Sequence, residues 1–261
     1  MHITADMYNY IASSTGFDIL MPDWVQEGGF DEWVKRLNDQ GVRKILGPEI
    51  KKTIQAKTGS AEGILIIGFN NDSLKYLTGK TLAEVAALRG TNPEETVMDL
   101  VIDDGSRVGA VYFSMSEDNV KRQIALPWMA FCSDGQSNAP EGVFLKSSTH
   151  PRAYGNFARL LGKYVREEKV IPLEEAIYKL TSFPAENLRI TRRGALKPGY
   201  YADIAIFDPE TIRDNATFEK PRQYATGMIH VFVNGKQVLK DGEHTGAMPG
   251  RVVRGPGWKQ E

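Results

Sequence analysis

Apolar and polar residues alternate at the start of the chain, which is the period-two pattern of a β-strand. Ile3, Ala5 and Met7 take the apolar positions within residues 2–10. Residues 30–58 instead space their apolar side chains as helices do, with breaks at Gly41 and at Gly47-Pro48. We therefore expect one strand followed by two or three helices.

The next part of the chain combines a short apolar run with two helix-start signals. Residues 63–69 are apolar, β-branched and bounded by turn residues, which predicts a buried strand. Thr81 and Glu84 have the spacing of a capping box that opens a helix over residues 81–88. Asn92-Pro93 predicts the start of a second helix.

Residues 108–132 have the pattern of a strand, a helix and a second strand. Residues 108–115 and 128–132 are apolar runs, and residues 116–124 between them have helical spacing. Such a unit is typical of parallel α/β architecture. The pattern so far predicts an α/β fold.

The last third of the chain changes from helical to strand patterns. Helices are expected at about residues 154–167 and 173–181, both ending before Pro184. Short strand patterns follow, with Asn234-Gly235 as a two-residue hairpin signal between residues 228–233 and 236–239. A further strand is expected over residues 202–207. We place a domain boundary near residue 190, giving an α/β part over residues 1–190 and a β-rich module over residues 191–261.

Composition and charge narrow the classes of protein that fit. The 261 residues, 41% hydrophobic and 25% charged, suit a folded globular chain with room for a small barrel enzyme. A net charge of −1 offers no field for nucleic acid or anionic lipid, so we expect a small-molecule substrate or a protein partner. The single cysteine, Cys132, and the lack of a signal-peptide or membrane-spanning pattern lead us to expect a cytoplasmic protein, although a signal on a longer precursor would be invisible.

Asp134 is the first candidate for chemistry. It follows an apolar strand in Phe131-Cys132-Ser133-Asp134-Gly135, the position where α/β barrels place catalytic groups. Such a carboxylate can bind a metal or act as a general base. It can also be a turn residue that caps the following loop, and spacing alone favours that second interpretation.

The polar loop over residues 135–152 supplies further candidates. Arg152 could bind a substrate carboxylate, and His150 could donate a hydrogen bond or transfer a proton, or both could be structural. Tyr8, Tyr10 and Ser14 at the end of the opening strand could orient a carbonyl or a carboxylate of a substrate. A buried tyrosine whose hydroxyl bonds the backbone is commoner than one that contacts a substrate. Cys132 fits a small core residue better than a nucleophile.

Several common catalytic motifs are missing. The four histidines are scattered, so no His-x-His pair or HExxH helix can hold a catalytic zinc, and neither a GxSxG elbow nor a phosphate loop is present. The sequence motifs alone thus leave the reaction undetermined.

Three segments of the chain carry motifs that occur together in one family. They begin at Thr4 (TADMYNY, then ASST), at Cys132 (CSDG) and at His150 (HPRAYGNF). Together they resemble the N-acyl-D-amino-acid deacylases (D-aminoacylases) of the metal-dependent amidohydrolase superfamily. A tail motif, ADIAIFDP from Ala202, resembles the superfamily more generally. Asn9 stands where the family's usual Tyr-Pro-Tyr has proline.

The resemblance implies a fold, a reaction and a set of roles. The fold would be a (β/α)8 TIM-like barrel with a small β-sandwich module, with residues 30–104 as an inserted subdomain. The reaction would be zinc-dependent hydrolysis of the amide of an N-acyl-D-amino acid, with Asp134 as the base near the metal and a possible metal ligand. Arg152 would hold the substrate carboxylate, with Tyr8, Tyr10, Ser14 and His150 as further polar contacts.

The family's histidine and cysteine zinc ligands have no counterpart in this sequence. We therefore expect a C-terminal part of a barrel enzyme, completed by a missing N-terminal half or by a partner subunit. Two alternatives stay open. One is a non-catalytic truncated paralogue or split subunit, and the other is a cyclic amidase of the dihydroorotase-like type.

Overall fold

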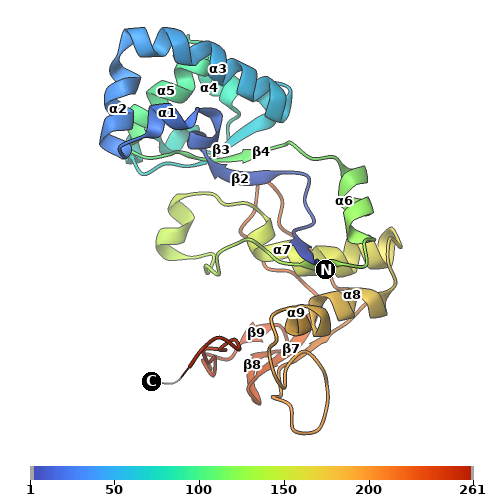
Figure 1. Cartoon of the computed structure of the whole chain (residues 1–261). Helices are drawn as coiled ribbons and strands as arrows, with labels where there is room; N and C mark the ends of the chain where they lie inside the picture. The colour runs from blue at the N-terminus through green and yellow to red at the C-terminus, as the bar shows by residue number, and fades with distance from the viewer. Residues whose placement is uncertain (1–2, 260–261) are drawn as a thin grey trace. The chain divides into compact units, whose positions relative to one another are not determined.

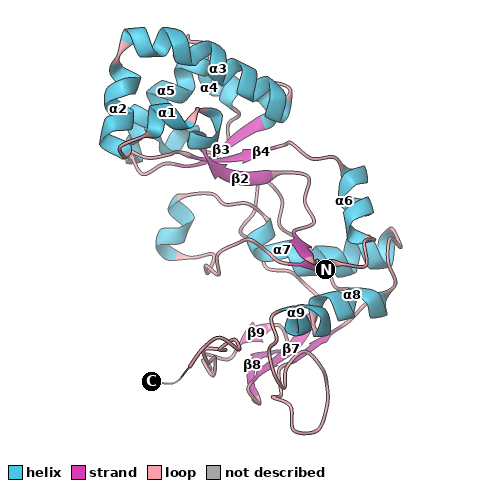
Figure 2. Cartoon of the chain, viewed as in Figure 1, coloured by secondary structure: helices cyan, strands magenta, loops and turns pink. Residues whose placement is uncertain are grey.

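The computed structural model describes residues 3–259, which form two compact units of one chain (Figure 1). The first unit consists of Met1–Asn9, Glu117–Gln136 and Pro151–Glu261, and the second consists of Tyr10–Ser116 and Ser137–His150. Both units contain helices and strands (Figure 2), so the predicted mixed α/β class is confirmed. The predicted insert, residues 30–104, lies wholly within the second unit.

The second unit contains a three-stranded antiparallel sheet and five α-helices around one hydrophobic core. The strands lie in the order β2 (Ser13–Gly16), β4 (Gly109–Tyr112) and β3 (Ile64–Gly68). The helices are α1 (Asp23–Gln26), α2 (Phe30–Asn38), α3 (Gln40–Thr58), α4 (Leu82–Arg89) and α5 (Pro93–Asp104). Short 3-10 helices occupy Phe17–Leu20, Ala61–Gly63, Asp72–Leu77 and Gly142–Lys146.

The starts of α4 and α5 follow the predicted capping signals. The Thr81 hydroxyl accepts a hydrogen bond from the Glu84 N–H at 3.2 Å, and the Glu84 carboxylate accepts one from the Thr81 N–H at 2.7 Å. The Asn92 side chain accepts from the Glu95 N–H at 2.8 Å at the start of α5. Both helix starts are therefore confirmed.

The predicted breaks at Gly41 and Gly47-Pro48 are wrong. The chain instead breaks at Asp39, whose carboxylate accepts hydrogen bonds from the N–H groups of Gly41 and Val42 and thereby caps α3. Pro48 lies inside α3, which buries Leu46, Ile50 and Ile54. Burial of this apolar face outweighs the backbone hydrogen bond that proline removes.

The first unit pairs β1 (Ala5–Met7) with β5 (Met129–Phe131) in parallel, with Met7 opposite Phe131. Its helices are α6 (Glu117–Ile124), α7 (Arg152–Arg159), α8 (Leu173–Leu180) and α9 (Ser182–Asn187), and a π-helix over Leu160–Glu167 continues α7. Lys179 of α8 is 1% exposed, and its ammonium donates to the carbonyls of Ile124 and Leu126 at 2.7 and 2.8 Å. This buried lysine fixes the turn between α6 and β5.

An antiparallel sheet follows near the C-terminal end of the same unit. Its strands lie in the order β6 (Ile204–Phe207), β7 (Met228–Val233), β8 (Lys236–Lys240) and β9 (Glu243–His244). Asn234 and Gly235 between β7 and β8 have φ angles of 49° and 79°, as the predicted two-residue hairpin requires. The hairpin is confirmed, and the short strand β9 was not predicted.

One further expectation is wrong. The strand, helix and strand of residues 108–132 do not form one parallel unit, because β4 pairs antiparallel with β2 and β3 while β5 pairs with β1. The predicted helices at about residues 154–167 and 173–181 are confirmed and end before Pro184, and the separate helix α9, which contains Pro184, was not predicted. Pro184 lies in the first turn of α9, where its missing N–H would have no helical acceptor in any case.

Within residues 3–259, no helix combines the length and the apolar character needed to cross a membrane.

Candidate functional site

The parallel pairing of β1 and β5 brings two predicted segments to one edge of the sheet. Met7 and Phe131 are register partners at the carboxyl ends of the two strands. Tyr8 follows the first strand directly, and Cys132, Ser133 and Asp134 follow the second. Because parallel strands end at the same edge, these side chains start from neighbouring positions.

The Ser133-Asp134-Gly135 turn depends on the residue type at each of its three positions. The Ser133 hydroxyl accepts a hydrogen bond from the Gly135 N–H at 3.3 Å. Asp134 has a φ of 43°, in the left-handed region that aspartate tolerates better than most residues. A Cβ on Gly135 would lie 2.8 Å from the Cα of Ala153, so only glycine fits at this close approach.

Arg152 closes this turn against the start of α7. Its Nε donates to the Asp134 carbonyl at 2.9 Å, and its Nη2 lies 2.9 Å from the Asp134 Oδ2. The guanidinium carbon also lies 4.4 Å from the centroid of the Tyr8 ring, a cation–π contact. We call Tyr8, Asp134 and Arg152 the Asp134 site.

Burial differs sharply within the Asp134 site. The Arg152 side chain is 8% exposed, whereas the Asp134 side chain is 64% exposed. The arginine is therefore held mainly by the protein, while the carboxylate can contact water or a ligand. The fixed guanidinium can bind a negatively charged group of a ligand. The accessible carboxylate beside it can transfer a proton at a neighbouring atom of the same ligand.

Burial also raises the pKa of two neighbours of Asp134. Desolvation raises the pKa of Tyr8, an effect that the nearby Arg152 charge partly offsets. Desolvation and a hydrogen bond with Asp6 raise the pKa of the Cys132 thiol to about 11. Cys132 is thus protonated at neutral pH, which agrees with a structural role and not a nucleophilic one.

The other three predicted site residues lie in the second unit. His150 is 3% exposed and Tyr10 is 2% exposed, and their rings make an edge-to-face contact at 5.2 Å. The His150 Nε2 lies 2.9 Å from the Ala12 carbonyl oxygen. Ser14 of β2 donates its hydroxyl to the Ala110 carbonyl at 3.1 Å. These contacts show how the three residues are held, and their roles toward a substrate stay predictions.

The chemistry of the donor set gives no metal site. Among residues 3–259, no group of three or more histidine, cysteine, aspartate or glutamate side chains could hold a metal ion. His2 lies outside the described residues. Asp134 as a metal ligand thus stays a prediction, and the described residues by themselves do not fit the zinc that the resemblance implies.

Asn9 and Asn156 hydrogen-bond each other beside the Asp134 site and had no predicted role. Asn156 of α7 is 2% exposed and donates its amide to the Cys132 carbonyl at 2.6 Å. Asn9 is fully buried and hydrogen-bonds Asn156. The signal for this role in the sequence was Asn9 itself, which stands where the resemblance leads us to expect proline. Unlike proline, asparagine has a backbone N–H that can donate a hydrogen bond.

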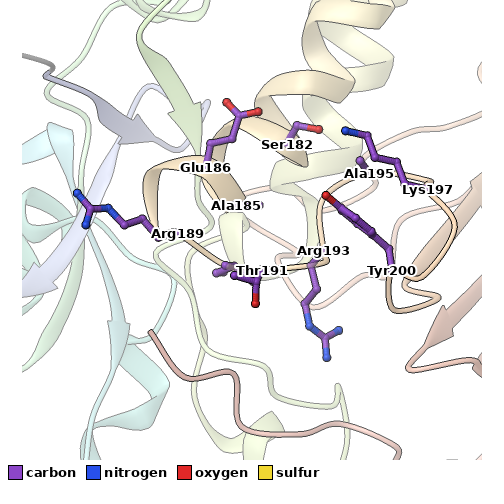
Figure 3. A pocket seen from close by; sticks show the side chains of 10 residues that line it. Ser182, Ala185, Glu186, Arg189, Thr191, Arg193, Ala195, Lys197 and Tyr200 are labelled. Carbon is purple, nitrogen blue, oxygen red and sulfur yellow. The ribbon is translucent and has the colours of Figure 1, made fainter. Parts of the chain in front are cut away.

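A pocket of about 260 Å³ lies elsewhere in the first unit (Figure 3). Its lining includes Ser182, Glu186, Lys197 and Tyr200 and none of the predicted site residues. Arg193 also borders it, but its head group points away and bonds the Asn234 side chain at 2.7 Å (Figure 3). The pocket is therefore separate from the Asp134 site in its residues.

Comparison with known proteins places this architecture in a family. A family model described as the amidohydrolase family matches residues 62–239. The chain belongs to the amidohydrolase family. A D-aminoacylase from Alcaligenes xylosoxydans xylosoxydans is 39% identical over 177 residues, which cover 68% of this chain and 34% of the relative. The chain thus spans about a third of that relative's length, and the predicted resemblance to D-aminoacylases is confirmed.

Solved structures of this amidohydrolase family agree with the sequence match. The crystal structure of a D-aminoacylase that defines a novel subset of amidohydrolases superposes with a TM-score of 0.70 at 32% identity, covering 96% of this chain and 42% of that one. An N-acyl-D-glutamate deacylase from Bordetella bronchiseptica, complexed with zinc and a phosphonate inhibitor, gives 0.65 at 29% identity, covering 92% and 41%. A Lactobacillus johnsonii dihydroorotase matches a shorter stretch, 37% identical over 97 residues, 33% of this chain and 23% of that relative.

Proposed function

We propose that this amidohydrolase hydrolyses the amide bond of N-acyl-D-amino acids. The observation that carries the proposal is the Asp134 site at the carboxyl ends of two parallel strands, in a chain 39% identical to a D-aminoacylase over the matched residues. An N-acyl amino acid presents a carboxylate next to the amide that is cut. The site offers a guanidinium and a carboxylate side by side, with the Arg152 Nη2 2.9 Å from the Asp134 Oδ2.

In this proposal each residue of the site has one role. Arg152 binds the substrate carboxylate, because a planar guanidinium suits the two oxygens of a carboxylate. The exposed Asp134 carboxylate accepts a proton from the attacking water and returns it to the amine that leaves. Tyr8 packs on the guanidinium and holds its plane. Tyr10, Ser14 and His150 remain proposed polar contacts to the substrate.

The proposal keeps the larger assembly that the resemblance implies. We propose that β1, β5 and their helices are the C-terminal part of a TIM-like barrel. The sheet of β6 to β9 would belong to a β-sandwich module. A missing barrel half or partner subunit would complete the enzyme. The 42% coverage of the D-aminoacylase structure supports this. Zinc is carried over from the family, and the roles above are those of this chain's own side chains. We also propose a cytoplasmic location, which the single cysteine supports.

The direct test compares the two enantiomers of one substrate. The chain, completed by the missing barrel half or partner subunit and supplied with zinc chloride, is incubated with N-acetyl-D-leucine or N-acetyl-L-leucine, and the free amine is measured. We expect the D-substrate to be cut at least about tenfold faster, because the relative that the chain matches is a D-aminoacylase. Equal rates for both enantiomers would contradict the proposed substrate class.

A second candidate function is hydrolysis of a cyclic amide. The match to dihydroorotase over 97 residues favours it, although that match covers half as much of this chain as the D-aminoacylase match. The same preparation is assayed for ring opening of dihydroorotate. Turnover of dihydroorotate with no release of amine from N-acetyl-D-leucine would favour the cyclic amidase.

A third candidate is a non-catalytic subunit. The limited coverage of the relative and the lack of a metal-binding group among the described residues favour it. The absence of turnover on both substrates with zinc supplied would support this alternative. It would remove the proposed catalytic role of this chain in the completed enzyme.

A further inference from the structure

One buried side-chain amide connects the chain just beyond both parallel strands. The Asn156 Nδ2 donates to the Cys132 carbonyl at 2.6 Å, one residue past the end of β5. The Asn156 Oδ1 accepts from the Asn9 N–H at 2.9 Å, two residues past the end of β1. The Asn156 backbone carbonyl accepts from the Asn9 side chain, also at 2.9 Å. A single side chain thus bridges the two strand ends.

Helix α7 and the π-helix that continues it also bind the Asn9 carbonyl. The Asn9 carbonyl accepts hydrogen bonds from the Arg159 Nε at 3.1 Å and from the Tyr164 hydroxyl at 3.2 Å. Arg159 and Tyr164 are five residues apart, a spacing that points in different directions in an α-helix but in similar directions in a π-helix. The π-helix that begins at Leu160 therefore allows both donors to reach one carbonyl.

Asn9 carries a cost that these contacts must offset. Its side-chain oxygen is buried and has no hydrogen-bond partner in the part of the chain that the structure describes. A buried acceptor without a partner destabilises the folded state. Its N–H, side-chain amide and carbonyl are nevertheless all bonded to α7 and the π-helix. The arrangement maintains a fixed position for this segment despite the cost.

Every residue of the Asp134 site lies within four positions, along the chain, of a residue in this bridge. Tyr8 precedes Asn9, Asp134 lies two residues after Cys132, and Arg152 lies one turn before Asn156 on α7. We propose that Asn156 is the positioning residue of the Asp134 site, because its one amide sets the spacing of the two strand ends and of the helix that carries Arg152. Only the use of the site in deacylation rests on the proposed function; the positioning itself does not.

The chemistry of the side chain explains why asparagine is needed. An amide supplies a donor for the Cys132 carbonyl and an acceptor for the Asn9 N–H at the same time. Leucine has the same number of side-chain heavy atoms in the same branched arrangement and supplies neither. The substitution Asn156→Leu therefore removes the bridge while limiting the loss of packing.

The test reads the geometry of the site without any substrate. The full chain is labelled with ¹⁵N, and hydrogen exchange is followed at two donors, the Asn9 backbone N–H and the Arg152 Nε–H that bonds the Asp134 carbonyl. In Asn156→Leu we expect both to exchange at least about tenfold faster, because the site opens locally while the fold persists. The matched control Asn187→Leu, at the end of α9, should change neither by more than about twofold.

The outcomes separate positioning from general support of the fold. Faster exchange at Asn9 with an unchanged rate at Arg152 would overturn the proposal, because the bridge would then not reach the site. Asn156→Ala serves as the second variant if Asn156→Leu does not fold. If both variants lose far-UV circular dichroism, Asn156 holds the fold as a whole and the proposal fails. Failure of the deacylase assay leaves this result unaffected, since no substrate is used.

Discussion

Arg152 and Asp134 form an ion pair whose two partners differ in burial. The arginine is nearly buried and the aspartate is mostly exposed. An exposed pair contributes little to stability, but a buried guanidinium that loses its acceptors is costly. The contact to the Asp134 backbone carbonyl should therefore matter more for folding than the contact to its carboxylate.

This asymmetry predicts the effect of two substitutions at Arg152. Arg152→Ala should lower the free energy of unfolding by about 1–3 kcal/mol, because two hydrogen bonds and the contact with Tyr8 are lost. Arg152→Lys should recover only part of this, since an ammonium cannot form both bonds from one plane. Urea titration followed by circular dichroism measures both. Arg122→Ala, on the exposed face of α6, is the matched control, and an equal loss there would argue against the account.

The pKa of Cys132 predicts how this sole cysteine reacts. Alkylation by iodoacetamide requires the thiolate, so the rate in the folded chain should be low at pH 8 and should still increase above pH 10, as the pKa of about 11 requires. In urea the rate should level off above a pKa of about 8.5. Since folding raises the pKa, stability should fall as pH rises between these two values. A native rate that levels off near pH 9 would show that the thiol is not desolvated, and Cys132→Ala should give no signal.

At the scale of the residue, the sequence could indicate chemistry but not contacts. Asp134 and Arg152 were candidates because a carboxylate follows an apolar strand and a guanidinium follows a polar loop. That the two ends of this loop close on each other depends on the glycine contact with Ala153, which no local pattern encodes. For the same reason the roles of Asn9 and Asn156 could not be predicted.

At the scale of the element, local signals in the sequence predicted helix starts and turns, but the pairing of distant strands could not be predicted. The capping box at Thr81 and the hairpin at Asn234 involve neighbours in sequence, and both are present. The partner of β4 lies far away in the chain, and its antiparallel pairing with β2 contradicts the expected parallel unit. The apolar run 108–115 fits either arrangement, so the pattern could not distinguish them.

The π-helix gives a prediction at this scale. A Cβ on Gly162 would lie 2.6 Å from the Ile212 carbonyl oxygen, so Gly162→Ala should force the π-helix and the segment at Ile212 apart. We expect a loss of about 1–3 kcal/mol in the free energy of unfolding. Gly250→Ala, where an added Cβ meets nothing within 4 Å, should change it by less than about 0.5 kcal/mol. Equal values for the two variants in urea titration would refute the steric argument.

At the scale of the whole molecule, the chain is divided into two compact units, each built from segments that are separate in the sequence. Tyr10–Ser116 with Ser137–His150 has its own core, which includes Trp33, Leu46 and Val97. The boundary predicted near residue 190 followed the change from helical to strand patterns and lies within the first unit. A change of pattern marks a change of secondary structure, whereas compact units depend on contacts between distant segments.

This division predicts two steps in thermal unfolding. Calorimetry should resolve two transitions, since each unit has contacts mainly within itself. Leu46→Ala, at a fully buried position of the second unit, should destabilise only one of them, by about 2–5 kcal/mol. Ala176→Gly, at a fully buried position of α8 in the first unit, should lower the other. A single transition lowered by both substitutions would show that the chain unfolds as one body.

We propose that Asp134 performs proton transfer in amide hydrolysis by this amidohydrolase. The most direct measurement is kcat for N-acetyl-D-leucine in the completed enzyme, with the missing barrel half or partner subunit present and zinc supplied. It is compared between the wild type, Asp134→Asn and the control Asp118→Asn on the exposed surface of α6. Asparagine keeps the shape but cannot accept the proton, so we expect kcat to fall by at least about 100-fold in Asp134→Asn and to be unchanged in the control. Wild-type turnover in Asp134→Asn would contradict the account.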